Sequence, residues 1–408
     1  MEDIDQLERI YLDNNATTPV APQVMETMLP YYMKFYGNPS SVHWAGREVE
    51  KAVSDARLQV AELIKAKPEE IIFTAGGSES DNFAILGSCD ALSGKGSHII
   101  TTAVEHPAVL DTCRYFEQRG GKVTYLGVDR RGQIDLDELE QAINAQTVLI
   151  SVMWANNETG TIFPVAAIAD IARRYNIQFH CDAVQAVGKV PIDMEECPVD
   201  MLSISGHKIG APKGIGVLYV RNGTQLNPYL HGGHQEGSMR AGTHNVAGIV
   251  ALGKACQLAQ QDLAKNVEHL RQLRDRLQQG IVASISDVCI NGDQENRLPN
   301  TLNVGFSFVE GEGLLLSLDM YGIAASSGSA CTSGSDAPSH VLSAMAVDKL
   351  LLQSSLRFSL GYQTTSADID KTLAVLPAIV DKLRAMSPMV GDEVNVTNCT
   401  YVECCIDH

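Results

Sequence analysis

Residues 200–220 read DMLSISGHKIGAPKGIGVLYV, two short apolar runs joined by a glycine-rich turn. The turn from Gly206 to Gly216 is too short for a crossover helix, so the two runs are predicted to pair antiparallel. Lys208 lies in this turn, directly after the first run. Strand ends of α/β proteins commonly carry ligand-binding groups. A lysine that forms a Schiff base needs such a half-buried setting, because desolvation favours the neutral amine.

Further β-rich runs precede this stretch, with amphipathic helical segments between most of them. The runs lie at 70–75, 97–102, 122–128, 147–154 and 177–182. Their alternation with helices predicts an α/β fold with a mostly parallel central sheet. From Asn245 to about Ile281 the apolar residues recur every three or four positions, which predicts a long helix that enters a smaller α+β domain.

Three parts of the chain are therefore predicted. They are a large domain over 14–262, a small domain formed by 1–13 and 263–388, and an acidic tail over 389–408 that contains cysteines.

Charge and composition exclude several classes of protein. The 408 residues carry 31 Lys and Arg against 49 Asp and Glu, a net charge of −18, which disfavours nucleic acid and anionic membranes as partners. No apolar run approaches the ~18–20 residues of a membrane span. The acidic start MEDIDQLERI is unlike a signal peptide, so a cytoplasmic protein is expected. Ten cysteines without a CxxC pair are expected to be mostly buried, reduced thiols.

Two other strand ends carry polar groups. Asp182 ends the run IQFHCD and is followed by Gln185. Its carboxylate could keep the pyridine nitrogen of pyridoxal phosphate (PLP) protonated, or it could simply cap a following helix. The sequence FTAGGSESDN at 73–82 combines a strand end, a small-residue turn and a helix start. Such a helix N-terminus suits a phosphate, although a plain capped turn has the same pattern.

These motifs match a known family in order and spacing. The chain has YLDNNATTP (11–19), YGNPSSVH (36–43), TAGGSESDN (74–82), EHPAVLDTCR (105–114), NNETG (156–160), DAVQ (182–185), SGHK (205–208), MRAGTHN (239–245), SSGSACTSGS (326–335) and SLRFSLG (355–361). Over about residues 10–388 the chain resembles the NifS/IscS-type cysteine desulfurases of the class V aminotransferase group. The resemblance implies the PLP-dependent transferase fold type I and a homodimer.

The resemblance also implies a role for individual residues. Lys208 would hold PLP covalently, Asp182 would pair with the pyridine nitrogen, Gln185 with the phenolic oxygen, and His106 would stack on the ring and move protons. The phosphate would be bound by Gly77, Ser78, Ser205, His207 and, from the second subunit, Thr243. Asn157 and Arg357 would bind the substrate carboxylate. Without the resemblance, His106 would be interpreted as a surface or capping residue and Arg357 as part of a structural ion pair.

Cys331 stands in a segment of small and polar residues without an aromatic or branched aliphatic neighbour. Such a segment packs weakly, which favours an exposed thiol that can reach a substrate. The resemblance places the catalytic cysteine of the family here. Its thiolate would attack the sulfur atom of L-cysteine. That sulfur would stay on Cys331 as a persulfide, and L-alanine would be released. The acceptor of that sulfur is expected to be an iron–sulfur scaffold protein or another sulfur acceptor.

Two parts of the chain depart from the family pattern. Residues 232–243 read GGHQEGSMRAGT where the family commonly has GGGQERGxRxGT, so His234 replaces a glycine and Gly237 an arginine. The contacts around 232–240 therefore stay open. The tail contains four residues of the types that bind metals, namely Cys399, Cys404, Cys405 and His408. Because they lack a paired motif, no metal site is predicted.

Other functions use many of the same residues. A selenocysteine lyase, or another class V lyase or aminotransferase, would share Lys208. A plain aminotransferase has no need of Cys331. A non-catalytic docking protein of sulfur metabolism would not need the set Lys208, Asp182, His106 and Cys331. The preference for cysteine or selenocysteine, and a role in nitrogenase or in general iron–sulfur assembly, are left open by the sequence.

Overall fold

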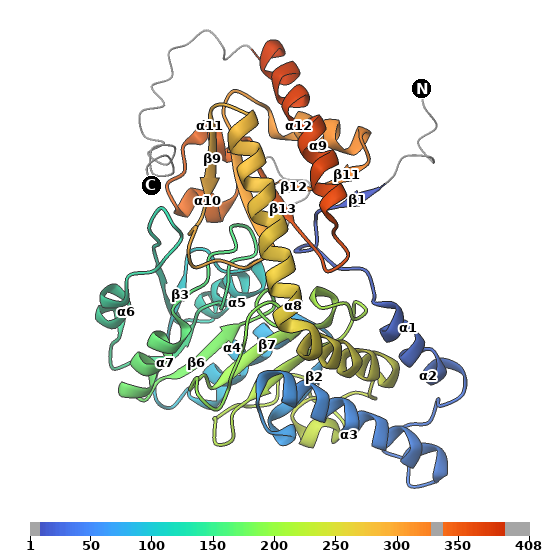
Figure 1. Cartoon of the computed structure of the whole chain (residues 1–408). Helices are drawn as coiled ribbons and strands as arrows, with labels where there is room; N and C mark the ends of the chain where they lie inside the picture. Colours follow the sequence, from blue (N-terminus) through green and yellow to red (C-terminus); the bar gives the residue numbers. More distant parts are fainter. Residues whose placement is uncertain (1–8, 328–337, 388–408) are drawn as a thin grey trace.

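The computed structural model describes residues 9–327 and 338–387. Its larger sheet has seven strands, and each comes from one of the predicted β-rich runs (Figure 1). In spatial order they are β2 (Ile71–Thr74), β8 (Gly216–Val220), β7 (Met201–Ser205), β6 (Gln178–Asp182), β5 (Thr147–Ser151), β3 (His98–Thr102) and β4 (Lys122–Leu126). Only β8 runs against its neighbours, which confirms both the mostly parallel sheet and the antiparallel β7–β8 pair.

Helices cover both faces of this sheet. Alternate strand residues point to opposite faces, so Ile100 packs into a core on one side and its neighbour Ile99 into a core on the other. The Ile99 side is covered by α4 (Gly77–Ala91) and α5 (Pro107–Gln118). The Ile100 side is covered by α1 (Pro22–Met28), α3 (Trp44–Ile64), α7 (Val165–Arg174) and the first half of α8 (Val246–Ser284). Short helices α2 (Pro30–Met33) and α6 (Leu136–Ala142) complete this part.

A second, smaller sheet lies beyond the far half of α8. Its antiparallel strands are β12 (Ser326–Ser327), β13 (Ser355–Ser359), β10 (Thr301–Phe306) and β9 (Val288–Asn291). The accompanying helices are α9 (Gly311–Met320), α10 (His340–Ala344), α11 (Lys349–Gln353) and α12 (Ser366–Met386). Figure 1 shows α8 running from the larger sheet up to this second group, as the recurrence of apolar residues every three or four positions predicted.

The beginning of the chain contacts the second group first. β1 (Ile10–Tyr11) pairs in parallel with β11 (Ile323–Ala324), and Ile10 and Leu12 are buried in the smaller core. The chain then crosses to the larger sheet, so residues 13–18 lie where the two groups meet. The domain boundaries at 13/14 and 262/263 stay predictions. No helix within the described ranges is long and apolar enough to cross a membrane.

Candidate active site

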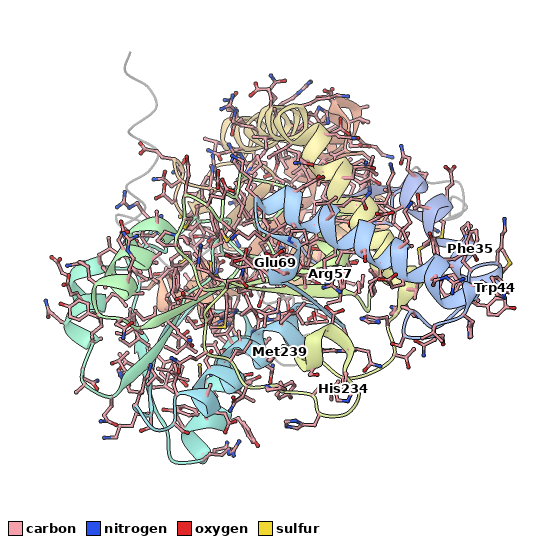
Figure 2. The ribbon with its side chains drawn as sticks, turned by 90° about the horizontal axis from the view of Figure 1, so that it is seen from below. Phe35, Trp44, Arg57, Glu69, His234 and Met239 are labelled. Atoms are coloured by element: carbon pink, nitrogen blue, oxygen red, sulfur yellow. The ribbon has the colours of Figure 1, made fainter. Side chains whose placement is uncertain are left out.

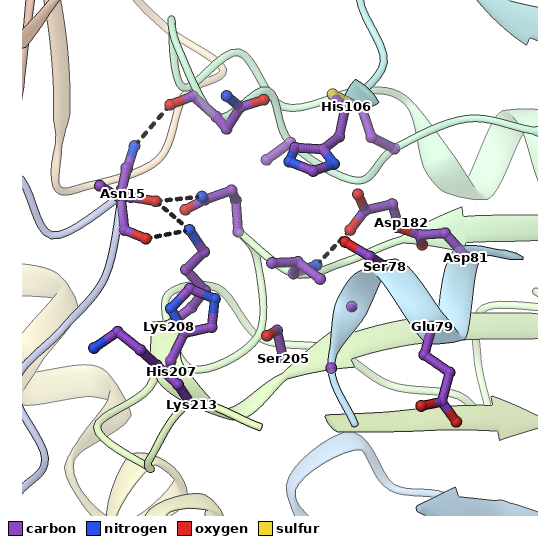
Figure 3. Close-up of a pocket in the computed structure, with 18 of the residues that line it drawn as sticks. Asn15, Ser78, Glu79, Asp81, His106, Asp182, Ser205, His207, Lys208 and Lys213 are labelled. Atoms are coloured by element: carbon purple, nitrogen blue, oxygen red, sulfur yellow. Dashed lines mark hydrogen bonds between the residues drawn. The ribbon is translucent and has the colours of Figure 1, made fainter. Parts of the chain in front are cut away.

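Lys208 ends a single 3₁₀ turn, Gly206–Lys208, which follows β7 directly. The turn is tight because Gly206 donates to Ile215 O at 3.0 Å, and Gly210 follows with φ +83°, a conformation that favours glycine. The half-buried Lys208 amine donates to the backbone oxygens of Asn15 and Ala16, the latter at 2.8 Å (Figure 3). Asn15 and Ala16 thus hold the amine of Lys208 in a half-buried position at the strand end, as the sequence predicted.

Asp182 ends β6, two strands away from β8, and is 7% exposed. Its Oδ1 accepts the N–H of Val184 at 2.9 Å, and a turn follows instead of a helix, so the helix-capping alternative is wrong. Burial raises the pKa of Asp182, while the charges of His106 and Lys208 oppose that rise. A buried carboxyl group in this state is strongly stabilised by a cationic N–H donor.

His106 caps a helix and also lines the cavity that contains Lys208. It is the N-cap of α5, where its Nδ1 accepts the N–H of Ala108 at 3.1 Å, and it also lines the same cavity as Lys208. Burial is the main reason that the pKa of His106 is lowered. The neutral ring therefore carries its proton on Nε2, because Nδ1 is an acceptor.

The start of α4 forms a cradle for a small anionic group. Gly76 and Gly77 open the helix, and no side chain in the described part of the chain caps it. A Cβ on Gly77 would lie 2.7 Å from Val184 Cγ2, so only glycine allows this close approach. Glu79 in the first turn would repel an anion, but Arg240 binds it through two bonds of 2.8 and 3.2 Å. The free N–H groups of the helix start therefore face the cavity without an uncompensated carboxylate.

Arg357 is fully enclosed on β13, with 1% of its surface exposed. Its Nη2 pairs with Asp13 Oδ1 at 2.8 Å and its Nη1 donates to Asn157 O at 3.1 Å. The Nε has no hydrogen-bond partner among the residues that the structure describes. The structural ion pair is therefore present, and one buried donor of the same guanidinium is left for a ligand.

One cavity of about 620 Å³ brings most of the predicted site residues together (Figure 3). Its lining includes Gly77, Ser78, His106, Asn157, Asp182, Gln185, Ser205, His207, Lys208 and Arg357. Thr243 is exposed and does not line it, and Cys331 lies outside the described residues. Burial and then the charges of Lys208, Lys213 and Lys189 lower the pKa of His207 to about 4, so that ring is neutral at pH 7.

Sequence reasoning did not find every residue that shapes this cavity. Asn15 and Asp81 also line it, and Asp13 and Lys189 contact residues that do. The motif YLDNNATTP was noted for the resemblance without a role for its asparagines. The polar residues Asp13, Asn14 and Asn15 directly after a short apolar run were the signal that could have indicated them. Lys189 lies only four positions after Gln185, but the sequence does not show that its side chain is buried.

The residues that depart from the family pattern lie outside the cavity. His234 is exposed and its ring contacts Ser238 Oγ at 3.2 Å. Gly237 has φ +63°, between two non-glycine residues that also have positive φ, so a glycine suits this position. Glu236 beside it is buried against Arg57 and His244, at 2.6 and 2.7 Å. Figure 2 shows Arg57 of α3 facing the segment that carries His234 and Met239.

No group of three His, Cys, Asp or Glu side chains that could hold a metal ion occurs in residues 9–327 or 338–387. The tail residues considered as metal ligands lie outside these ranges. Five of the six described cysteines are buried and Cys289 is half-buried, all as free thiols, as expected.

Comparison with known proteins gives the family. Residues 10–372 match the aminotransferase class-V family. A cysteine desulfurase of Trichormus azollae is 54% identical over 384 residues, 94% of this chain and 96% of that protein. Cysteine desulfurase IscS of Dictyoglomus turgidum is 52% identical over 379 residues, 93% of this chain and 96% of the relative.

Solved structures agree. A NifS-like protein superposes with a TM-score of 0.87 at 39% identity and covers 92% of this chain and 100% of its own. A NifS-like protein from Rickettsia africae superposes with a TM-score of 0.83 at 31% identity, with the same coverage. These likenesses confirm the resemblance drawn from the motifs and the fold that it implied. The chain belongs to the aminotransferase class-V family.

Proposed function

We propose that this chain is a PLP-dependent cysteine desulfurase, which converts L-cysteine to L-alanine and keeps the sulfur as a persulfide on Cys331. Relatives named cysteine desulfurase, 52% and 54% identical over nearly their whole length, support the reaction. The observation that carries the proposal for the site is the meeting of Lys208, Asp182 and the start of α4 in one cavity.

The residues of the cavity fit PLP. The glycine cradle at α4 would hold the phosphate, together with the side chains of Ser78, Ser205 and His207. The buried carboxyl group of Asp182 would accept a hydrogen bond from the pyridine nitrogen. A protonated pyridine nitrogen is a cationic donor, which would stabilise the ionised carboxylate against the effect of burial. Gln185 would bond to the phenolic oxygen. When bound, PLP withdraws electrons from the Cα atom of an attached amino acid.

Lys208 and His106 would handle the protons. Lys208 would hold the cofactor covalently and, once displaced by the substrate amine, take the proton from Cα. The backbone oxygens of Asn15 and Ala16 orient its amine in the cavity. His106 would exchange its Nε2 proton, because the bond from Ala108 occupies Nδ1 and the ring is neutral at pH 7.

Arg357 would bind the substrate carboxylate together with Asn157. Its two terminal nitrogens are already fixed by Asp13 and by Asn157 O, so the orientation of the guanidinium is set before substrate arrives. The unpartnered Nε supplies the donor, and such pre-organisation reduces the entropy that binding costs.

Cys331 would carry the sulfur. Its thiolate would attack the substrate Sγ, so an S–S bond forms and the Cβ–Sγ bond breaks. The electron pair of the broken bond stays with the carbon, and protons from the site complete L-alanine. The persulfide would then pass to a thiol of an acceptor, for which the resemblance indicates an iron–sulfur scaffold protein.

We also propose a homodimer. Thr243 is exposed outside the cavity of its own chain, which supports its predicted contact with the phosphate of a second copy. A separate cavity is lined by Ser40, Met239 and His244, so Ser40 lies close to the Thr243 segment. Near Ser40 in the sequence, Tyr36, Val42 and Trp44 expose 74, 90 and 65% of their surface (Figure 2, Trp44), and a dimer would cover such apolar area.

An assay of L-alanine and sulfide release from L-cysteine and L-selenocysteine, on wild type and Cys331→Ala, tests the function. A desulfurase releases alanine from L-cysteine and loses sulfur transfer with Cys331→Ala. Turnover restricted to L-selenocysteine would identify a selenocysteine lyase. Amino-group transfer to a keto acid without sulfur release would identify an aminotransferase, and the absence of any turnover with PLP bound would indicate a docking protein.

A further inference from the structure

A second lysine lies buried beside the candidate active site. Lys189, in the turn after β6, is only 7% exposed, and its Nζ donates to Gln185 Oε1 at 2.8 Å and to Asn15 Oδ1 at 3.4 Å. Neither partner is a carboxylate. Burying a charged amine among neutral partners costs folding free energy. Burial, and then the charges of Lys208 and Arg357, accordingly lower the pKa of Lys189 to about 7.

Lys189 and the backbone oxygen of Asn15 together determine which end of the Gln185 amide faces the cavity. In its protonated form Lys189 only donates hydrogen bonds, and the Gln185 atom that it contacts at 2.8 Å is the amide oxygen. The Gln185 nitrogen donates one N–H to Asn15 O at 3.0 Å. Gln185 is 5% exposed and lines the cavity, so the second N–H of this nitrogen is the group that it can present there.

Asn15 connects this pair to the reactive lysine. Its backbone oxygen accepts hydrogen bonds from both Gln185 Nε2 and Lys208 Nζ (Figure 3). Its side-chain oxygen accepts from Lys189 and, at 3.1 Å, from Asn300 Nδ2. At 1% exposure Asn15 has little freedom, so Gln185 and Lys208 are oriented against one fixed residue.

We propose that Lys189 is a positioning residue of the active site: by holding the Gln185 oxygen, it makes Gln185 a hydrogen-bond donor toward the phenolic oxygen of PLP. The role rests on the proposed function, because that function places PLP in the cavity. Without Lys189 only the bond to Asn15 O orients the amide. The amide can then rotate more easily and turn its oxygen toward the phenolate oxygen, where two acceptors repel each other.

A double-mutant cycle tests this role. Lys189→Met keeps the length of the side chain and removes the donor, and Gln185→Leu removes the amide. In the wild-type background Lys189→Met is expected to raise the dissociation constant of PLP about tenfold, the loss typical of a hydrogen bond to a charged group. It should also shift the absorption maximum of the bound PLP and the pH midpoint of its spectral change. In the Gln185→Leu background the same change should have less than about a twofold effect.

Lys265→Met is the matched control, because this exposed lysine on α8 lines only a neighbouring cavity. It should leave both the spectrum and the PLP affinity unchanged. If Lys189→Met does not fold, Lys189→Gln takes its place, with a smaller shift in the same direction. An unchanged spectrum and affinity in the Lys189 variant, or equal losses in both backgrounds, would overturn the positioning role.

The outcomes for the function and for the positioning role are separable. If wild type binds PLP and shows the coupling but releases no alanine from L-cysteine, the proposed reaction is wrong and the role of Lys189 stands. A wild-type chain that fails to bind PLP overturns both.

Discussion

At the scale of single residues, the position of Lys208 depends on two backbone oxygens of a distant segment. Asn15 and Ala16 accept from its amine, while Lys213, five residues later, is exposed at the rim of the same cavity. Two lysines so close in sequence therefore have different surroundings, and only Lys208 has the half-buried setting that Schiff-base chemistry needs.

Lys208→Ala is therefore expected to abolish the visible absorbance of lysine-bound PLP and to lower alanine release by roughly 10²–10⁴-fold or more. Lys213→Ala should keep the absorbance. Absorption spectra and an alanine assay on both variants check this. Full activity in Lys208→Ala would move the assignment to Lys213.

The described cysteines are expected to differ from Cys331 in how readily their thiols ionise. Burial is the main reason that the pKa of Cys89 and of Cys256 rises to about 12, so neither forms much thiolate at neutral pH. Iodoacetamide is therefore expected to label Cys331 well before the described buried cysteines, and turnover with L-cysteine should add the mass of one sulfur to the Cys331 peptide. Peptide mass spectrometry measures both.

Cys331→Ala should still bind PLP, because Lys208 is untouched, but sulfur transfer should fall by orders of magnitude. Truncation after Ser387 removes the tail cysteines as competing labels, and Cys289→Ala is a control at a half-buried thiol. Persulfide formation at the wild-type rate in the truncated Cys331→Ala chain would show that another group carries the sulfur.

At the scale of elements, the segment 232–245 is held to α3 and β2 by one carboxylate. Glu236 accepts hydrogen bonds from Arg57, His244 and the Phe73 N–H. Burial alone would raise the pKa of Glu236, but these bonds and the Arg57 charge outweigh it and lower the pKa from 4.5 to about 2. These bonds offset the backbone cost of two non-glycine residues with positive φ, Glu236 and Ser238.

Because the folded pKa lies below the unfolded one, the stabilisation is complete above pH 4.5 and is lost as the pH falls toward about 2. Glu236→Gln should lower the free energy of unfolding by about 2–3 kcal/mol at neutral pH, and this difference should shrink through the same window. Urea unfolding across that range measures it. Glu69→Gln, at an exposed acid nearby (Figure 2), should change little. A pH-independent difference would refute the ionic clamp.

At the scale of the whole molecule, the proposed dimer would place Thr243 at the phosphate site of a second copy of the chain. Thr243→Ala is expected to weaken PLP binding by about 1–2 kcal/mol, the usual effect of losing a hydrogen bond to a charged group. The dimer itself should persist in sedimentation experiments, because the exposed apolar residues near Trp44 remain. Thr224→Ala serves as the control threonine. A stable monomer with full activity would contradict both the dimer and the shared phosphate site.

Local patterns in the sequence were sufficient for the strands of the larger sheet and for the long helix. The β-rich runs place the strands, the recurrence of apolar residues every three or four positions places the helix, and the short Gly206–Gly216 turn determines the direction of β8, because these signals act over few residues. The long helix was predicted from 245 to about 281 and spans Val246–Ser284. Lys208, Asp182 and the α4 start were found for the same reason, since each lies at the end of a recognisable strand.

Only the tertiary structure decided how these groups are held. Asp13 meets Arg357 across 344 positions of sequence, and Asn15 meets Lys208 across 193. Lys189 is only four positions from Gln185, but its burial and its bond to Asn15, across 174 positions, are not visible in that spacing. Such contacts depend on where the chain start crosses between two cores. That crossing is set by packing of the whole molecule, so a local pattern contains no information about it.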